Sequence, residues 1–228
     1  MRTRAALTLA LLACPLAARA QDRGVAFAGG QTDHSRAAYY GVELALPGAA
    51  LGHGLAVRGS AFVGDYAYEA DTLGRVKADF RGAEVDGVYQ WSGGWGWATA
   101  GVGLRYVETE LGPRDPGNRR HGRQGELAFS TDGSRLMGPW RVDWYGSYGT
   151  RLSDFQGRVS LTRQAGPVFR VGVEAAGEAD PTYDQERIGP FAALRLGPRS
   201  EVQGSAGVSR QSGRDAAAYA RISIYRSF

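Results

Sequence analysis

The chain has 228 residues, 34 of them glycine, and its 27 basic and 23 acidic residues give a formal net charge of +4. This length suits one large all-β domain, and the glycine content favours tight turns and closely packed strands over helices. A charge so near balance lacks the clustered basic surface that binds nucleic acid, and a single cysteine excludes an internal disulfide.

The first 20 residues have the features of a cleavable signal peptide. Two arginines precede an apolar run over residues 5–13, and Ala-Arg-Ala at 18–20 offers a cleavage site between small residues. We therefore expect residues 21–228 to form the exported domain, which would keep 24 of the 27 basic residues against 23 acidic ones. Cleavage before Cys14, as in a lipoprotein, is an alternative, but its leader would be shorter than the usual ~15–30 residues. No apolar run of about 18 residues follows, so we expect no helical membrane span.

Alternation of apolar and polar residues with a period of two continues along the rest of the chain and predicts strands. The expected strands lie at 24–30, 38–46, 54–66, 79–91, 95–108, 124–131, 140–150, 156–164, 168–176, 187–196, 201–210 and 216–228. Short turns are expected at 92–94, 165–167, 197–200 and 131–134, and longer polar loops at 67–78, 109–123 and 177–186. Short turns at one end and longer loops at the other are typical of bacterial outer-membrane barrels.

The hairpin over residues 79–108 distinguishes a membrane barrel from a soluble protein. Val85 and Tyr89 alternate with Glu84 and Asp86, and both arms exceed the about five or six residues usual for strands in soluble proteins. Strands of about 9–11 tilted residues cross a bilayer. An aliphatic face that ends in aromatics, opposite an ionisable face, is typical of a transmembrane barrel. A hairpin in a soluble β-sandwich is the competing interpretation.

The aromatic residues favour the barrel. In the expected arrangement they gather at both ends of the strands, as they do where a barrel crosses the two membrane–water interfaces. One group comprises Trp91, Trp95, Trp97, Trp140, Phe169 and Phe228, and the other Tyr40, Phe80, Tyr106 and Tyr148. We therefore predict an all-β fold, a closed up-and-down antiparallel transmembrane β-barrel of twelve strands. Its location would be a Gram-negative outer membrane, in contact with outer-membrane lipid.

Four segments resemble one protein family. They are GLAVRGSAFVGDYAYE (54–69), EVDGVYQW (84–91), GVGLRYVETELGPRDPGN (101–118) and PTYDQERIGPF (181–191). On these segments, which span most of the exported domain in order, the chain resembles the cellulose biosynthesis protein BcsS family, found with bacterial cellulose-synthesis genes. The resemblance implies an outer-membrane role in cellulose production or export, with cellulose or components of the cellulose-synthase complex as partners. It implies no particular reaction.

The face opposite the apolar one supplies the candidate binding residues. They are Arg58, Glu84, Asp86, Arg105, Glu126, Arg141, Asp143, Tyr145, Arg158, Arg170, Glu174, Arg195, Arg221 and Tyr225. One interpretation is a polar lumen that binds or passes a glycan, with Tyr145 and Tyr225 as stacking platforms. The other is an ion-pair network that fills a narrow barrel, which twelve strands favour because wide aqueous pores need about 16–18 strands. Further candidates, for binding polysaccharide or another envelope component, are the loop residues Asp115, Asn118, Tyr183 and Arg187.

An outer-membrane lipid-modifying enzyme, such as a lipid-A acylhydrolase, is the alternative function. It needs a nucleophile, a base and an orienting group, and Asp33, His34 and Ser35 lie together in the first loop. Adjacent residues rarely point at each other, and no Gly-x-Ser-x-Gly sequence is present. Three scattered histidines, and a single cysteine in the leader, predict no metal site. We therefore expect no catalytic residues and no cofactor.

Overall fold

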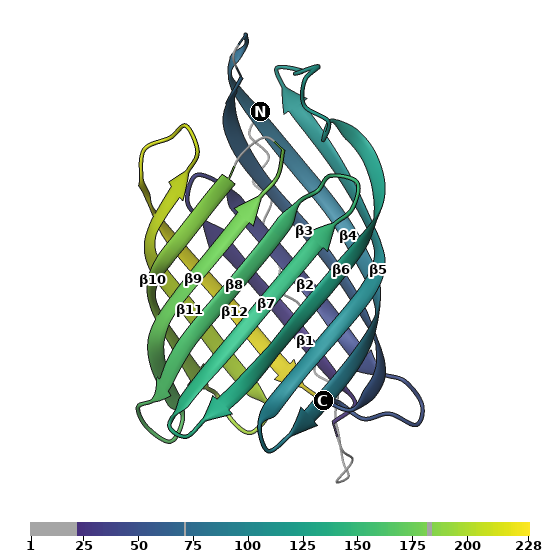
Figure 1. The fold of residues 1–228 in the computed structure, drawn as a ribbon, viewed down its shortest axis with the longest axis vertical. Coiled ribbons are helices and arrows are strands. Elements are labelled where there is room, and N and C mark those ends of the chain that lie inside the picture. Colours follow the sequence, from purple (N-terminus) through teal and green to yellow (C-terminus); the bar gives the residue numbers. More distant parts are fainter. Residues whose placement is uncertain (1–21, 71, 182–183) are drawn as a thin grey trace.

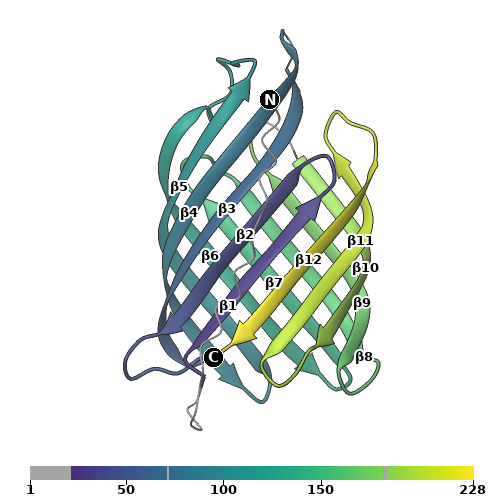
Figure 2. The same cartoon turned by 180° about the vertical axis from the view of Figure 1, so that it is seen from behind.

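The computed structural model describes residues 22–70, 72–181 and 184–228, and its strands close into a barrel (Figure 1). In chain order the strands are β1 (Gly24–Thr32), β2 (Arg36–Ala45), β3 (Gly54–Ala70), β4 (Gly74–Gly93), β5 (Gly96–Gly112), β6 (Gly122–Met137), β7 (Trp140–Gly149), β8 (Phe155–Gln164), β9 (Phe169–Ala179), β10 (Asp184–Arg195), β11 (Ser200–Gln211) and β12 (Ala217–Ser227). Each strand pairs antiparallel with its neighbours in sequence, and β1 also pairs with β12 (Figure 2). The prediction of an all-β, closed, up-and-down barrel of twelve strands is therefore confirmed.

The two ends of the barrel differ. At the end that carries the C-terminus, which we call the turn end, β4 passes to β5 through residues 94–95 and β6 to β7 through 138–139. At the opposite end, the loop end, β3 to β6 extend beyond the other strands (Figure 1), and the β5–β6 connection spans residues 113–121. The described part of the chain holds no helix long and apolar enough to cross a membrane. The expected signal peptide, residues 1–20, lies outside the described residues and stays a prediction.

Side chains alternate between the inside and the outside of the barrel. On β4 the inward-facing Asp86 is 2% exposed, whereas its outward-facing neighbour Val85 is 59% exposed. The buried side chains are thus largely polar and the exposed ones largely apolar, the reverse of a soluble protein. Val102 and Val171, which would meet in the dry centre of a sandwich, are both exposed on the outer face. The β-sandwich interpretation is therefore wrong.

Part of each predicted long loop is instead strand. The segments 67–78 and 109–123 were expected as loops because they are polar, yet β3, β4 and β5 continue into them. The same holds for 177–186, which β9 and β10 enter from both sides. Strands that extend beyond the membrane carry charge on their outward face at little cost, since that face meets water. Their inward face still buries apolar side chains, among them Tyr68 and Val76.

The turn predicted at residues 131–134 is also wrong, because β6 continues through them. Asp132 accepts a hydrogen bond from an inward-facing arginine. Gly133 lies opposite Trp144, whose ring occupies the space that a side chain on Gly133 would need. The chain turns instead at Gly138, which has a φ of +61°. Small and polar residues that indicate a turn in a soluble protein are here part of a barrel wall.

Aromatic side chains form two girdles around an apolar belt on the outer face, as expected for a barrel in lipid. The prediction that all ten aromatic residues belong to these girdles is wrong for Phe80 and Trp97, which occupy inward-facing positions of β4 and β5. Phe80 packs against Tyr66 with ring centroids 6.1 Å apart, and Trp97 is in register with the buried Ser134. The remaining predicted members are exposed, namely Tyr40, Tyr106 and Tyr148 toward the loop end, and Trp91, Trp95, Trp140, Phe169 and Phe228 toward the turn end.

Replacement of the belt residue Val102 by Arg tests the lipid-facing assignment. In the hydrocarbon layer the new charge is expected to lower the free energy of unfolding by about 2–4 kcal/mol. The measurement is denaturant unfolding of the protein folded in lipid vesicles. The control is Leu73→Arg at the β3–β4 connection, an exposed residue outside the belt, where the expected change is within about 0.5 kcal/mol. Equally small effects of both substitutions would contradict a membrane-spanning barrel.

Candidate functional site

The barrel interior brings together most of the predicted lumen residues. Arg195 is the exception, since it is exposed at the turn end of β10, beside a hollow of about 200 Å³ that Tyr225 also lines. Arg195 therefore lies at the rim and not among the interior charges. The candidates that face the interior are Arg58, Glu84, Asp86, Arg105, Glu126, Arg141, Asp143, Tyr145, Arg158, Arg170, Glu174, Arg221 and Tyr225.

Near the turn end, two arginines link strands that are not neighbours. Arg58 on β3 lies 2.6 Å from Glu43 on β2 and 2.6 Å from Asp132 on β6. Arg170 on β9 lies 3.1 Å from Asp143 on β7. Because each guanidinium presents several donors in a fixed plane, one arginine can satisfy carboxylates on both sides of it. These ion pairs span the interior.

Glu174 on β9 is the centre of a second cluster. Arg221 on β12 donates from Nε to Glu174 Oε1 at 3.0 Å, Ser205 donates from its hydroxyl at 2.6 Å, and Arg158 Nε lies 3.7 Å from Oε2. The Glu174 and Arg221 side chains are 2% and 4% exposed. A buried ion is tolerated only when it is paired and its remaining hydrogen-bonding positions are filled. The surroundings of Glu174 meet both conditions.

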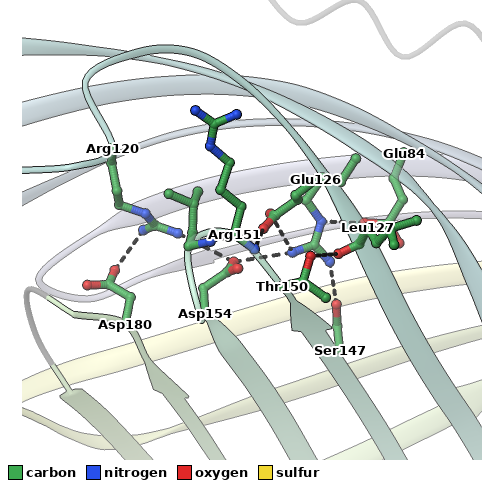
Figure 3. Close-up of polar contacts among 11 residues, drawn as sticks. Glu84, Arg120, Glu126, Leu127, Ser147, Thr150, Arg151, Asp154 and Asp180 are labelled. Carbon is green, nitrogen blue, oxygen red and sulfur yellow. Dashed lines mark hydrogen bonds and ion pairs between the residues drawn. The ribbon is translucent and has the colours of Figure 1, made fainter.

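Arg105 on β5 is the centre of a third cluster, closer to the loop end, whose partners Glu84, Ser147 and Asp154 are labelled in Figure 3. It donates to Glu84 and to Ser147, and its Nη1 lies 3.2 Å from Asp154. Glu84 and Glu126 lie directly opposite Arg105 on the two neighbouring strands. The strand register itself therefore places this guanidinium between two carboxylates. Asp154, in the β7–β8 connection, was missed by the sequence analysis because no alternation marks a residue outside the strands.

The β5–β6 connection, residues 113–121, packs onto the loop end of the barrel, and we call it the lid. Asn118 is buried and donates from Nδ2 to the Tyr68 hydroxyl at 2.8 Å, and Tyr68 donates to Asp115 at 2.7 Å. Two of the predicted loop candidates thus fasten the lid to β3. Tyr68 was missed, since the sequence analysis ended the third strand before it.

Arg120 joins the lid to two carboxylates of other connections at the loop end. Its Nη1 lies 2.7 Å from Asp180, which follows β9, and its Nη2 lies 3.4 Å from Asp154 (Figure 3). Asp154 therefore joins the lid to the Arg105 cluster below it. The lid is held by charge on one side and by the Tyr68 hydrogen bonds on the other.

Arg187, a loop candidate at the start of the strand expected over 187–196, lies within β10 and faces the interior. It donates to Asp33 in the β1–β2 connection, and its Nη2 lies 3.0 Å from Glu178. Burial alone would raise the pKa of Asp33, but the hydrogen bond and the charge of Arg187 outweigh it and hold that pKa below its ordinary value. Asp33 is thus a carboxylate partner of Arg187. Tyr183, the fourth loop candidate, lies outside the described residues.

The residues that the enzyme alternative needs are not arranged for nucleophilic catalysis. The Ser35 hydroxyl donates to Asp33 at 2.9 Å, so it is directed at the carboxylate and not at His34. A nucleophile of this kind requires contact with its base. Among residues 22–70, 72–181 and 184–228, no group of three or more His, Cys, Asp or Glu side chains has an arrangement that suits a metal ion.

These contacts shield the central arginines of the interior from water. The side chains of Arg105, Arg170 and Arg221 are only 10%, 6% and 4% exposed, so water has little access to them. The guanidinium of Arg158 lies 5.5 Å from the ring centre of Tyr145 and occupies the face on which a sugar would stack. The geometry favours the ion-pair network over an open path for a glycan.

Glu174→Gln tests whether the interior is dry. The substitution leaves Arg221 and Arg158 buried without their carboxylate and is expected to lower the free energy of unfolding by about 3–5 kcal/mol. Unfolding in lipid vesicles is the measurement. The control is Asp65→Asn, which removes the partner of Arg36, an ion pair at 2.9 Å whose arginine is 75% exposed, and its expected cost is below about 1 kcal/mol. A cost for Glu174→Gln no larger than the control would mean that water fills the barrel.

Comparison with known proteins finds the same fold in several solved structures. The transport unit of the autotransporter AIDA-I from Escherichia coli has a TM-score of 0.52 at 10% identity, covering 96% of this chain and 94% of that one. The translocator domain of the autotransporter NalP from Neisseria meningitidis has a TM-score of 0.50 at 11% identity, covering 92% and 90%. The β domain of a Bordetella autotransporter has a TM-score of 0.50 at 14% identity, covering 90% and 98%.

At these identities the similarity concerns the fold alone. No match is found among curated proteins. The sequence does match one family, described as cellulose biosynthesis protein BcsS, over residues 25–228, which is nearly all of the barrel. The resemblance seen in the sequence is thereby confirmed, and the chain belongs to the BcsS family of cellulose biosynthesis proteins.

Proposed function

We propose that the protein spans the outer membrane and assists cellulose production or export as a scaffold and not as a catalyst. The family supports the process, and the buried ion pairs of the interior support the scaffold. In this role the barrel holds its loop end and its turn end in fixed positions on the two sides of the membrane. Cellulose, or components of the cellulose-synthase complex, would bind at those ends.

The outer surface supports the location. An apolar belt lies between two girdles of exposed aromatic residues, the arrangement that places a barrel across a bilayer. The expected signal peptide would deliver the chain to the periplasm, from which outer-membrane barrels assemble. Outer-membrane lipid is then the partner of the belt.

A narrow pore is the other form that the same role can take. An extended glucan chain would have to displace the lid and then separate charged pairs at each level of the interior, including Glu174 and Arg221. Breaking buried pairs without replacing their partners is costly. The burial of these ion pairs is therefore the single observation that favours a scaffold over a pore.

Deletion of the gene tests the role in cellulose production. We expect less cellulose at the cell surface, or cellulose that is released instead of retained, because the envelope site that positions it is gone. Extracellular and cell-associated cellulose would be measured separately by enzymatic digestion to glucose. Complementation with the wild-type gene should restore both fractions, whereas unchanged fractions in the deletion strain would refute the proposal.

Planar-bilayer recording tests the scaffold against the pore. The wild-type protein is expected to show no steady ion conductance, and a variant in which residues 114–120 are replaced by a short Gly-Ser linker should stay closed because the charged clusters beneath the lid remain. Conductance in the variant alone would make the lid the barrier. Steady conductance in the wild type would favour the pore.

A further inference from the structure

The outer face of β2 to β5 changes from apolar to charged near the loop end. In the strand register Tyr40, Ala61, Ala83 and Tyr106 lie side by side across these four strands. Exposed tyrosines of this kind mark the membrane–water interface. The next outward-facing residues toward the loop end are charged on β4 to β6. The apolar layer therefore ends between these two rows.

The charged row places Arg81 on β4, Glu108 on β5 and Arg123 on β6 directly side by side. Arg81 donates to Glu108 Oε2 from Nε at 2.9 Å and from Nη2 at 2.6 Å, and Arg123 donates to Oε1 from Nε at 3.1 Å. The two arginine side chains are 66% and 74% exposed. One carboxylate between two guanidiniums leaves a net positive charge, and part of each guanidinium faces the surroundings.

A surface hollow of about 400 Å³ lies beside this row. Val63 contributes apolar atoms to its lining, Arg81 contributes a guanidinium, and Asp65, Asp79, Glu108 and Glu110 contribute carboxylates. Only the part of this lining next to the belt, Val63 and Arg81, suits a ligand with an apolar part and an anionic part. Because the hollow is on the outer face at the edge of the belt, that ligand comes from the membrane.

A second row of charge limits where the anion can lie. Asp65, Asp79 and Glu110 are side by side on β3, β4 and β5, one row closer to the loop end. These carboxylates would repel a phosphate at their own level. The anion is therefore confined to the level of Arg81 and Arg123, directly above the last apolar row.

We propose that Arg81 and Arg123 bind a phosphate of lipid A, the phosphorylated glucosamine anchor of lipopolysaccharide in the outer leaflet. Lipid A carries its phosphates on sugars immediately above the acyl chains, which is the level of these arginines above Tyr106. Guanidinium groups bind phosphate through paired, charge-assisted hydrogen bonds. This inference rests on the outer-membrane location proposed above but not on the role in cellulose export, so either can fail alone.

The test is a binding titration of the purified, lipid-depleted barrel in detergent. The two probes are diphosphoryl lipid A and the same lipid lacking both phosphates. The wild type is expected to bind the phosphorylated lipid at least about tenfold more tightly, the contribution of one charge-assisted hydrogen bond. The variant Arg81→Gln/Arg123→Gln should lose that preference. The control Arg75→Gln/Arg114→Gln removes two exposed arginines farther from the belt and should keep it.

A second variant guards against misfolding of the first. Glu108→Gln keeps both arginines and removes the carboxylate that competes for them, so its affinity for diphosphoryl lipid A is expected to rise. Heat-modifiable migration on a gel checks that every variant is folded. Equal wild-type affinity for the two lipids, a loss of the preference in the control, or weaker binding by Glu108→Gln would overturn the proposal. Displacement of lipid A by an equal concentration of inorganic phosphate would also overturn it.

Discussion

The hydrocarbon layer offers no hydrogen-bond partner to a backbone amide, so a sheet that crosses it must have no open edge. Pairing of β1 with β12 meets this condition along residues 25–32. The carbonyl of Phe228 extends the seam by accepting hydrogen bonds from the amides of Arg23 and Gly24 at 2.8 and 3.0 Å. Closure then separates an outer face, which must be apolar, from an inner face, which lipid never touches. Every other feature of the molecule follows from that separation.

A barrel of twelve strands is narrow, and its charged interior residues must therefore satisfy one another. Glycines on the inner face make room for them. The Asp86 carboxylate occupies the space that a side chain on Gly103 would need, and the carboxylates of Glu126 and Asp154 converge at the space beside Gly149. Larger residues at these glycines would push apart the carboxylates around Arg105. Small residues on the inner wall are thus as much a part of the network as the ions.

Under the scaffold proposal, the functional surfaces lie at the two ends and on the outer face of the barrel. The loop end carries a lid tied down by Arg120 and Asn118, and the strands below it project beyond the membrane with charge on their outer face. The charged row of Arg81, Glu108 and Arg123 lies on the outer face at the level where the apolar belt ends. Lipid, glycan and protein partners would all meet surfaces of this kind, while the interior keeps those surfaces in place.

The amino-acid sequence by itself determined which face of each strand is wet, because alternation with a period of two survives in any arrangement of the strands. It therefore predicted the fold class, the strand number and most interior residues, such as Glu84 and Glu174. It erred where polarity can have more than one cause. Residues 131–134 belong to the barrel wall and not to a turn, and much of 67–78 is polar because β3 and β4 continue beyond the membrane.

Only the tertiary structure decided which charges meet. Glu174 and Arg221 lie on β9 and β12, and Asp33 and Arg187 belong to opposite halves of the chain. The curvature of the closed sheet and the stagger between its strands bring these side chains together, and neither is encoded within a single strand. The sequence also left Arg120 and Asp180 as unconnected loop charges and did not mark Asp154, because loops carry no periodic signal and their meeting point depends on the barrel closing beneath them.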